Sequence, residues 1–152
     1  MTSTSDMLVP AADATIDEVF DALVDAERYP QWLLGAKVVQ IVDRDWPRPG
    51  ASFEHEVGVG PMTVQDRTTV EDIDPGRRLT LLVRARPFIE AHVAFHVRPE
   101  AGGTRLTMTE KPAGLFRLLS PVIAPLVKVR NDRSLQRLAE LLAHAPGAVA
   151  PG

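Results

Sequence analysis

The sequence predicts an α+β fold, with a curved antiparallel sheet wrapped around a long C-terminal helix and two short helices after the first strand. Hydrophobic residues alternate with a period of two across the middle of the chain, from Lys37 to Lys111, and turn sequences interrupt this alternation. Hydrophobic residues recur at helical spacing in a short segment before that region and in a longer one after it. A sheet with one apolar face needs a covering layer, and the long helix is the natural one.

The N-terminal part of the chain is predicted to contain a flexible tail followed by a strand. Residues 1–6 are expected to form a flexible tail, because nothing periodic begins before Met7. Met7–Ala12 is predicted as a strand, and Pro10 favours an edge position because proline cannot donate to a strand ladder.

Two short helices are predicted next. Thr15 followed by Glu18 forms a capping box, the signature of a helix start. Behind it, one helix face carries Ile16, Val19, Phe20 and Leu23. A second short helix begins at Asp25 or Ala26 and ends at Gly35.

The period-two region contains six candidate strands, separated by short Pro- and Gly-containing turns. They are Lys37–Asp43, Ser52–Val57, Met62–Ile73, Arg78–Arg86, Ile89–Arg98 and Arg105–Lys111. Short turns between successive strands indicate an antiparallel meander. The turn at Asp74–Gly76 is expected to pair Val70 with Leu79, which would place Glu71 opposite Arg78.

The last element is a long helix. Ser120-Pro121 provides a cap and a first helical residue, and the helix is expected to run to about Ala143. Its core-facing stripe comprises Val127, Asn131, Leu135, Leu138 and Leu142. Pro125 removes one helical hydrogen bond and is expected to bend the first turns.

Length and composition limit the function. The 152 residues are expected to form one domain, residues 7–144, with flexible tails at 1–6 and 145–152. A net charge of −3 argues against a nucleic-acid partner, whose binding surface needs a basic excess. The absence of cysteine excludes disulfides, thiolate zinc sites and thiol nucleophiles. No signal peptide or apolar span is evident, so we expect a cytoplasmic protein without stable membrane insertion; the oligomeric state is not predicted.

Several short motifs occur in a characteristic order along this pattern of elements. They are Ala12 to Trp32 with Asp17-Glu18-Val19-Phe20 and Tyr29-Pro30-x-Trp32, then Pro49-Gly50-Ala51-x-Phe53, Asp74-Pro75-x-Arg77, Gly103-Thr104-x-Leu106, and Arg130-Asn131 followed by Leu135 and Leu138. Over roughly Leu8 to Leu142 the chain resembles the START-like (SRPBCC) superfamily, and within it the polyketide cyclase/dehydrase and lipid-transport family.

The resemblance implies a helix-grip fold that encloses a deep hydrophobic cavity between the sheet and the long helix. It implies no cofactor, and no cluster of His, Asp and Glu at ligand spacing supports a metal. The side chains expected to line the cavity are Tyr29, Trp32, Phe53, Met62, Val64, Leu81, Val83, Phe88, Phe95, Met108, Glu110, Phe116, Leu119, Ile123 and Asn131. Trp46 and Phe88 fall in loops, where they either gate the opening or pack against the last helix.

Two inward polar residues are the candidate catalytic pair. His55 and Asp66 lie on the apolar faces of neighbouring strands, directly opposite each other or one diagonal apart. An imidazole beside a buried carboxyl could enolise a β-keto chain and protonate a departing hydroxyl. The alternative is a structural hydrogen bond, or two groups that orient a ligand carbonyl.

Two further polar residues face the predicted interior. Glu110 lies near the end of its strand, where a half-exposed carboxylate at the rim of the sheet is the simplest expectation. Asn131 on the long helix either binds a ligand or makes a helix-to-sheet hydrogen bond.

The apolar run from Gly114 to Val129 allows two interpretations. Its two prolines, and the core-facing stripe of the helix that follows them, favour a lid or a cavity wall. The run is also apolar enough to leave open a contact with a lipid surface.

Three functions remain open at this point. The first is the binding of a hydrophobic small molecule, such as a lipid or a polyketide, in the internal cavity. The second is a cofactor-independent polyketide cyclase or dehydratase that uses His55 and Asp66. The third is an interaction domain of the same fold, favoured if side chains fill the cavity.

Overall fold

The computed structural model describes residues 2–34, 36–59, 61–85 and 89–144. The elements in chain order are β1 (Ser3–Pro10), α1 (Ile16–Val24), the 3-10 helix η1 (Ala26–Arg28), α2 (Tyr29–Trp32), β2 (Ala36–Val42), β3 (Ser52–Val59), β4 (Met62–Asp74), β5 (Arg78–Ala85), β6 (Ile89–Glu100), β7 (Gly103–Pro112), the 3-10 helix η2 (Gly114–Leu119) and α3 (Ser120–His144). The predicted α+β class and helix-grip layout are confirmed.

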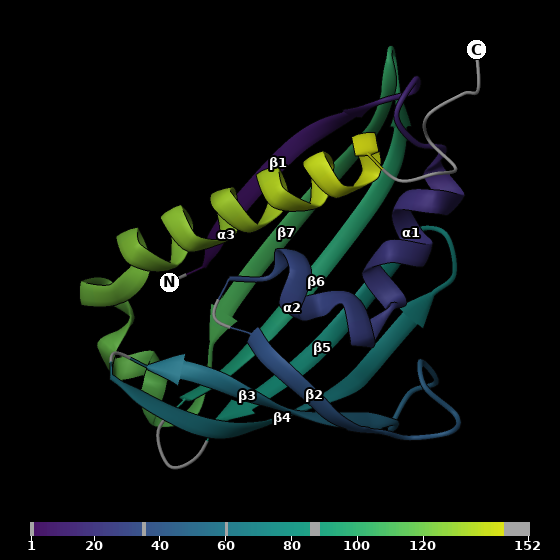
Figure 1. Cartoon of the computed structure of the whole chain (residues 1–152). Helices are drawn as coiled ribbons and strands as arrows, with labels where there is room; N and C mark the ends of the chain where they lie inside the picture. Colours follow the sequence, from purple (N-terminus) through teal and green to yellow (C-terminus); the bar gives the residue numbers. More distant parts are fainter. Residues whose placement is uncertain (1, 35, 60, 86–88, 145–152) are drawn as a thin grey trace.

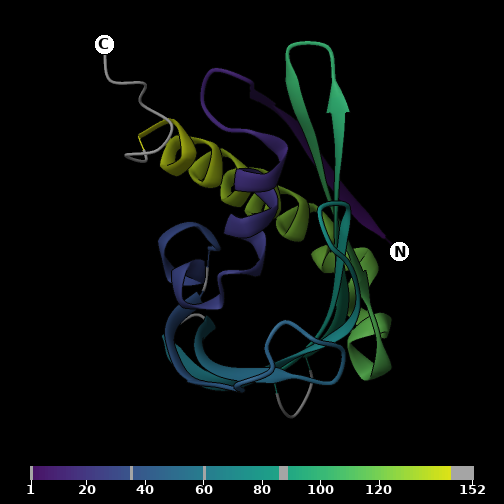
Figure 2. The same ribbon diagram turned by 90° about the vertical axis from the view of Figure 1, so that its right-hand side faces the viewer.

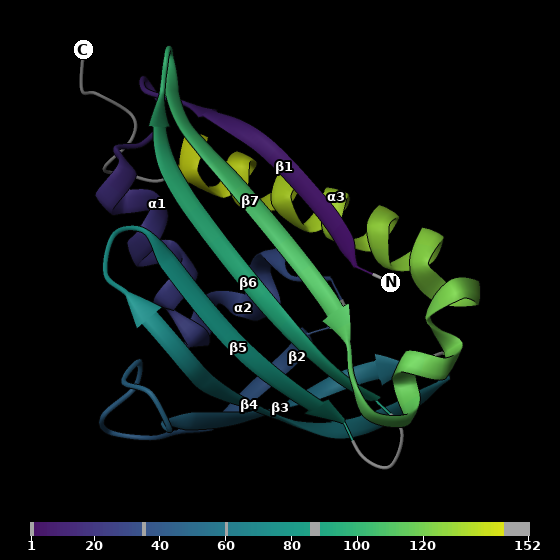
Figure 3. The same cartoon turned by 180° about the vertical axis from the view of Figure 1, so that it is seen from behind.

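The strands form one antiparallel sheet in the order β1-β7-β6-β5-β4-β3-β2. Figure 1 shows α3 crossing the open side of this sheet, with α1 and α2 on the same side. Turning the molecule shows how strongly the sheet bends around the helices (Figure 2). From behind, no helix of the described residues covers the outer face of the sheet across β4 to β7 (Figure 3). The interior between the sheet and α3 is therefore the place where inward side chains from both layers meet.

The first strand begins earlier than expected. Ser3 pairs with Glu110, and the ladder continues to Pro10 opposite Gly103. Residues 3–6 therefore belong to the sheet, and their assignment to a flexible tail was wrong. The partner strand β7 lies about a hundred residues away, so this pairing leaves no local signal in the sequence. β1 is an edge strand, as Pro10 predicted, and residues 145–152 of the expected C-terminal tail lie outside the described residues.

The register of the β4–β5 hairpin differs from the expected one. Val70 pairs with Leu81, and not with Leu79, because β4 continues to Asp74 and carries a bulge between Val70 and Asp72. A bulge adds one residue to one strand and resets the alternation of its faces. The turn itself is tight, with the amide of Arg77 donating to the carbonyl of Asp74 at 2.9 Å.

Helix α1 begins where its capping box predicted, and α3 begins at Ser120, the predicted cap residue. The Thr15 hydroxyl accepts from the amide of Glu18 at 3.1 Å, and the Glu18 carboxylate accepts from the amide of Thr15 at 3.0 Å. In α3 the predicted stripe faces the interior, with Asn131, Leu135 and Leu138 fully buried. Among the described residues, no helix is long and apolar enough to cross a membrane.

The outer face of the sheet carries paired charges. Arg67 donates to Glu54 at 2.8 Å, and Arg105 donates to Glu100 at 2.6 Å. His92 lies on the same face, against Glu71 at 2.5 Å. The outer face of the sheet is therefore a face of mixed, paired charges, and the candidate functional residues are those on the inner face.

Candidate functional site

Polar side chains collect on the inner side of the sheet beneath α3. Strand alternation turns Asp66 and Thr68 of β4 inward together with Val70, and each is at most 4% exposed. β7 contributes Glu110 to the same side, also 4% exposed, and α3 contributes Asn131. Burying a carboxyl group in an apolar interior is costly, so Asp66 and Glu110 each need a hydrogen-bonding or charged partner, or a function that explains their burial.

Glu110 has such a partner on α3. The Arg130 guanidinium donates to the Glu110 carboxylate at 2.5 Å, and the Asn131 amide approaches the same oxygen at 3.4 Å. The Asn131 carbonyl in turn accepts from Arg130 at 3.1 Å. Glu110 is thus a buried, ion-paired carboxylate, and the expectation of a half-exposed group at the rim was wrong. Asn131 makes the helix-to-sheet bond that was one of its two alternatives.

Arg130 is the residue that sequence reasoning missed. By helical periodicity it lies off the core stripe, and 41% of its side chain remains exposed. Its long stem nevertheless carries the guanidinium back over the edge of the helix to Glu110, as arginines at the border of an apolar surface commonly do. The one available signal was its position directly before Asn131 in a motif of the resemblance.

Asp66 has strongly perturbed acid–base behaviour. Burial raises the pKa of Asp66 from 3.8 to about 7. Backbone hydrogen bonds from Arg84 and Arg67 and the positive charge of Arg130 act in the opposite direction without offsetting the burial. Near neutral pH this carboxyl group is close to half protonated, so it can donate as well as accept a hydrogen bond.

The predicted pairing of His55 with Asp66 is tested only at the level of the backbone. The two residues are direct partners in the β3–β4 ladder, which is the closer of the two expected arrangements. The side chain of His55 lies outside the described part of the structure. Its contact with Asp66 therefore stays a prediction.

A chain of aromatic rings is buried in the core. Tyr29 packs edge-to-face on Trp32 at 5.4 Å and on Phe53 at 5.5 Å, and Trp32 reaches Phe95 at 6.0 Å between ring centroids. The Tyr29 hydroxyl donates to the carbonyl of Leu23 at 2.5 Å, and burial raises the pKa of Tyr29 above its usual range. This hydroxyl is therefore a structural group that holds α2 to the end of α1.

Two indole groups have different surroundings. Trp46 packs on Phe53 and donates from Nε1 to the carbonyl of Val24 at 2.7 Å, so it is held to the end of α1. Trp32 is fully buried, and in the part of the chain that the structure describes no acceptor lies within hydrogen-bond distance of its Nε1. A buried indole N–H without a protein acceptor is available to an oxygen of a bound molecule.

The remaining expected lining residues divide into two groups. Leu81 and Met108 are buried on the inner sheet face, and Val83 and Ile123 are half-buried. Phe88 lies outside the described residues, as do the side chains of Met62, Val64, Phe116 and Leu119.

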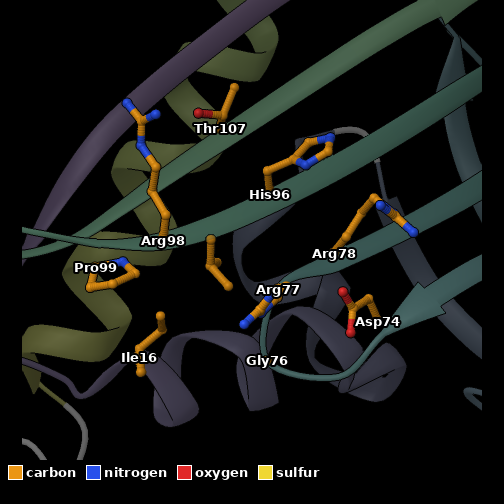
Figure 4. Close-up of a pocket in the computed structure, with 10 residues that line it drawn as sticks. Ile16, Asp74, Gly76, Arg77, Arg78, His96, Arg98, Pro99 and Thr107 are labelled. Atoms are coloured by element: carbon orange, nitrogen blue, oxygen red, sulfur yellow. The ribbon is translucent and has the colours of Figure 1, made fainter.

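A separate groove of about 810 Å³ lies at the far end of the sheet from η2, beside the β4–β5 turn (Figure 4). Its lining is strongly charged and includes Asp74, Arg77, Arg78 and Arg98 together with His96. None of the expected lining residues contributes to it. This groove does not have the apolar surface that a hydrophobic molecule requires.

No metal centre is evident among the groups whose placement is described. Within those residues, no three His, Cys, Asp or Glu side chains lie close enough together to hold a metal ion.

Comparison with known proteins assigns the family. The model for polyketide cyclase / dehydrase and lipid transport matches residues 9–143. The chain belongs to this family. The match covers every element from the end of β1 to the last turn of α3, and so includes all of the buried polar residues described above.

Solved structures share the fold of this family member. Protein CV1439 from Chromobacterium violaceum is 17% identical, with a TM-score of 0.73 over 93% of this chain and 97% of that one. TTHA0849 from Thermus thermophilus is 16% identical, with a TM-score of 0.73 over 96% and 99% of the two chains. DynU16, described as a putative protein in the dynemicin biosynthetic locus, is 21% identical with a TM-score of 0.68, over 97% of this chain and 49% of its own. No curated protein matches the sequence significantly.

Proposed function

We propose that the protein binds a hydrophobic small molecule that carries at least one oxygen function, between the inner face of the sheet and α3. The observation that carries this proposal is the buried carboxyl group of Asp66, whose pKa is raised to about 7. Such a group is costly to the fold and can serve as donor or acceptor to a ligand oxygen. Family membership supports a ligand of this class, a polyketide or a lipid.

The surroundings of Asp66 fit the same kind of ligand. Binding sites for small molecules are mostly apolar, with a few convergent polar groups that fix orientation. Leu81, Phe95 and Met108 provide apolar surface on the inner face, and the buried Trp32 indole provides a second donor. Each buried methylene contributes about 0.8 kcal/mol, so a ligand of about ten carbons gains micromolar affinity before any polar contact.

A substitution that adds an aromatic side chain to the interior tests this proposal. Val83 is a half-buried inner residue of β5, and its neighbour Leu82 points to the outer face of the same strand. We expect Val83→Trp to weaken the binding of 1-N-phenylnaphthylamine, an apolar fluorescent probe, by about tenfold or more, since it fills volume needed by the ligand. Leu82→Trp is the matched control and should bind the probe like the unaltered protein.

The two variants also define the contrary outcome. Thermal unfolding must first show that both are folded; if Val83→Trp is not, Val83→Phe replaces it. Equal probe affinity in the interior variant and its control would show that the probe sits elsewhere. That result would contradict an interior binding site. Both variants add an aromatic ring to β5, and they differ only in the face of the sheet on which the ring lies.

A second function, a polyketide cyclase or dehydratase, is favoured by one specific observation. A carboxyl group with a pKa of about 7 can transfer a proton at neutral pH, and His55 is its direct partner in the β3–β4 ladder. In a dehydration, His55 would take the proton from the carbon next to a carbonyl, and Asp66 would give its proton to the β-hydroxyl group. The C–H and C–O bonds break, a carbon–carbon double bond forms, and water leaves.

The variants His55→Ala and Asp66→Asn distinguish the ligand carrier from the enzyme. If the protein is an enzyme, a β-hydroxy ketone chain should be dehydrated by the unaltered protein, and both variants should bind that chain with turnover reduced by at least about a hundredfold. If the protein is a carrier, no turnover is seen in any of the three proteins and binding persists. Mass spectrometry of the products detects the loss of water directly.

A further inference from the structure

The outward face of α3 near its beginning is apolar. Val122 is 78% exposed, Leu126 is 72% exposed and Val129 is 49% exposed. Spacings of four and three residues align these side chains on one face of the helix, which is opposite the stripe of Asn131, Leu135 and Leu138 that enters the core. Leu118, in η2 directly before the helix, is 71% exposed. We call Leu118, Val122, Leu126 and Val129 the α3 apolar row.

This row is concentrated in one part of the molecule. Of the five large hydrophobic residues exposed in the described chain, four form the row and the fifth is Leu8 on β1. Figures 1 and 3 show that η2 and the first turns of α3 extend past the end of β1, so this part of the helix projects from the body of the molecule. A projecting set of large apolar side chains is typical of an interaction surface.

Two exposed arginines flank the row. From Pro112 to Asn131 the sequence contains three cations and no Asp or Glu, but Arg130 turns inward to Glu110 and Lys128 pairs with Asp132. Arg117 lies beside Leu118 and is exposed, and Arg133 follows Val129 one turn later on the same helix face. Lys128 is also at the surface and pairs with Asp132 at 2.9 Å.

These charges favour an anionic lipid surface over a second copy of the chain. A two-fold contact through the row would bring the arginines of both copies to one interface, where like charges repel each other. An anionic bilayer attracts the same arginines while its acyl region takes up the apolar side chains. The row is also too short to span a bilayer and suits a helix that lies in the interface.

We propose that the protein binds reversibly to anionic lipid bilayers through the α3 apolar row, with Arg117 and Arg133 at the level of the headgroups. The inner stripe of α3 keeps the fold closed while the outer face is in contact with the lipid. This proposal concerns the outer surface alone, so it stands whether or not the interior binds a ligand.

The experiment is vesicle co-sedimentation. Vesicles of phosphatidylcholine mixed with phosphatidylglycerol are compared with vesicles of phosphatidylcholine alone. We expect binding to the anionic vesicles, weakened by added salt, and about tenfold or more weaker binding to the neutral ones. The double variant Val122→Ser/Leu126→Ser should reduce binding to the anionic vesicles by about tenfold or more, because both side chains leave the acyl region.

Two controls make each outcome decisive. Leu8→Ser removes an exposed apolar residue outside the row and should leave binding unchanged. Light scattering after size-exclusion chromatography measures the oligomeric state. If the unaltered chain is a dimer and the double variant is a monomer, the row binds a second copy of the chain, and the proposal is overturned. Absence of binding to anionic vesicles, or equal binding by the double variant, would overturn it as well. Equal binding to neutral vesicles would overturn the role of the arginines.

Discussion

At the scale of single residues, Asp66 is the most informative side chain of the interior. Its raised pKa means that the folded chain holds a proton at pH values where the unfolded chain has released it. The unfolded state therefore binds fewer protons between the unfolded pKa of 3.8 and the folded pKa of about 7. The contribution of Asp66 to the free energy of unfolding falls as the pH rises through this window.

Asp66→Asn removes this dependence. Relative to the unaltered protein, the variant should gain stability between about pH 4 and about pH 8, by up to about 4 kcal/mol for a shift of about three pKa units. Urea unfolding at several pH values measures the difference. Asp21→Asn, at an exposed position on α1, is the control. Parallel stability curves for Asp66→Asn and the unaltered protein would show that Asp66 is not a buried, protonated group.

The ion pair between Glu110 and Arg130 gives a second test at this scale. Arg130→Met leaves the buried Glu110 carboxylate with only the distant Asn131 amide, and should destabilise the protein by about 1–2 kcal/mol. This is less than the loss of a fully buried pair, because the Arg130 side chain is 41% exposed.

A matched substitution on the same helix controls for the loss of a cation. Lys128→Met removes the exposed pair with Asp132 and should cost about 0.5 kcal/mol or less. Chemical denaturation of both variants provides the comparison. Equal losses would mean that burial of Glu110 adds nothing to the energy of its pair.

At the scale of elements, the capping box fixes the beginning of α1. Thr15→Ala should lower the free energy of unfolding by about 1 kcal/mol, because the Glu18 amide loses its acceptor. Thr15→Ser keeps a hydroxyl oxygen in the same place and should restore most of the loss. Thermal unfolding distinguishes the two, and a serine variant as unstable as the alanine variant would contradict the role of the cap.

The elements were also the level at which sequence reasoning worked best. Caps, prolines and strand alternation are local signals, so the strands, the helix pair after β1 and the long helix α3 followed from them, although η2 did not. The ladder pairing of His55 with Asp66 across a short hairpin also followed from them. The register of β4 with β5 did not, because the bulge after Val70 is set by the packing of the whole sheet.

At the scale of the whole molecule, the features that sequence reasoning missed depend on contacts between distant segments. Ser3 joins the sheet because β7 returns to lie beside it. Glu110 is buried because α3 covers that end of β7 and supplies Arg130 as a counter-ion. Neither segment has a local sequence signal that identifies its partner. The order of the elements predicted only that the sheet packs against the long helix.

The same scale connects the two proposals. The interior contains buried polar groups under α3, and the outward face of the same helix carries the α3 apolar row. A single helix therefore separates the proposed ligand site from the proposed lipid contact. The inner stripe of α3 packs into the core, whereas the fold alone does not explain the α3 apolar row on the outer face of its first turns.

Native mass spectrometry tests the central claim, that the interior holds a hydrophobic molecule, most directly. The protein is measured as purified and again after incubation with a mixture of long-chain fatty acids and aromatic polyketides. We expect a stoichiometric adduct of one small apolar molecule, which is lost in Val83→Trp and retained in Leu82→Trp. Spectra that contain only the bare chain under both conditions, or an adduct that persists equally in both variants, would contradict the account.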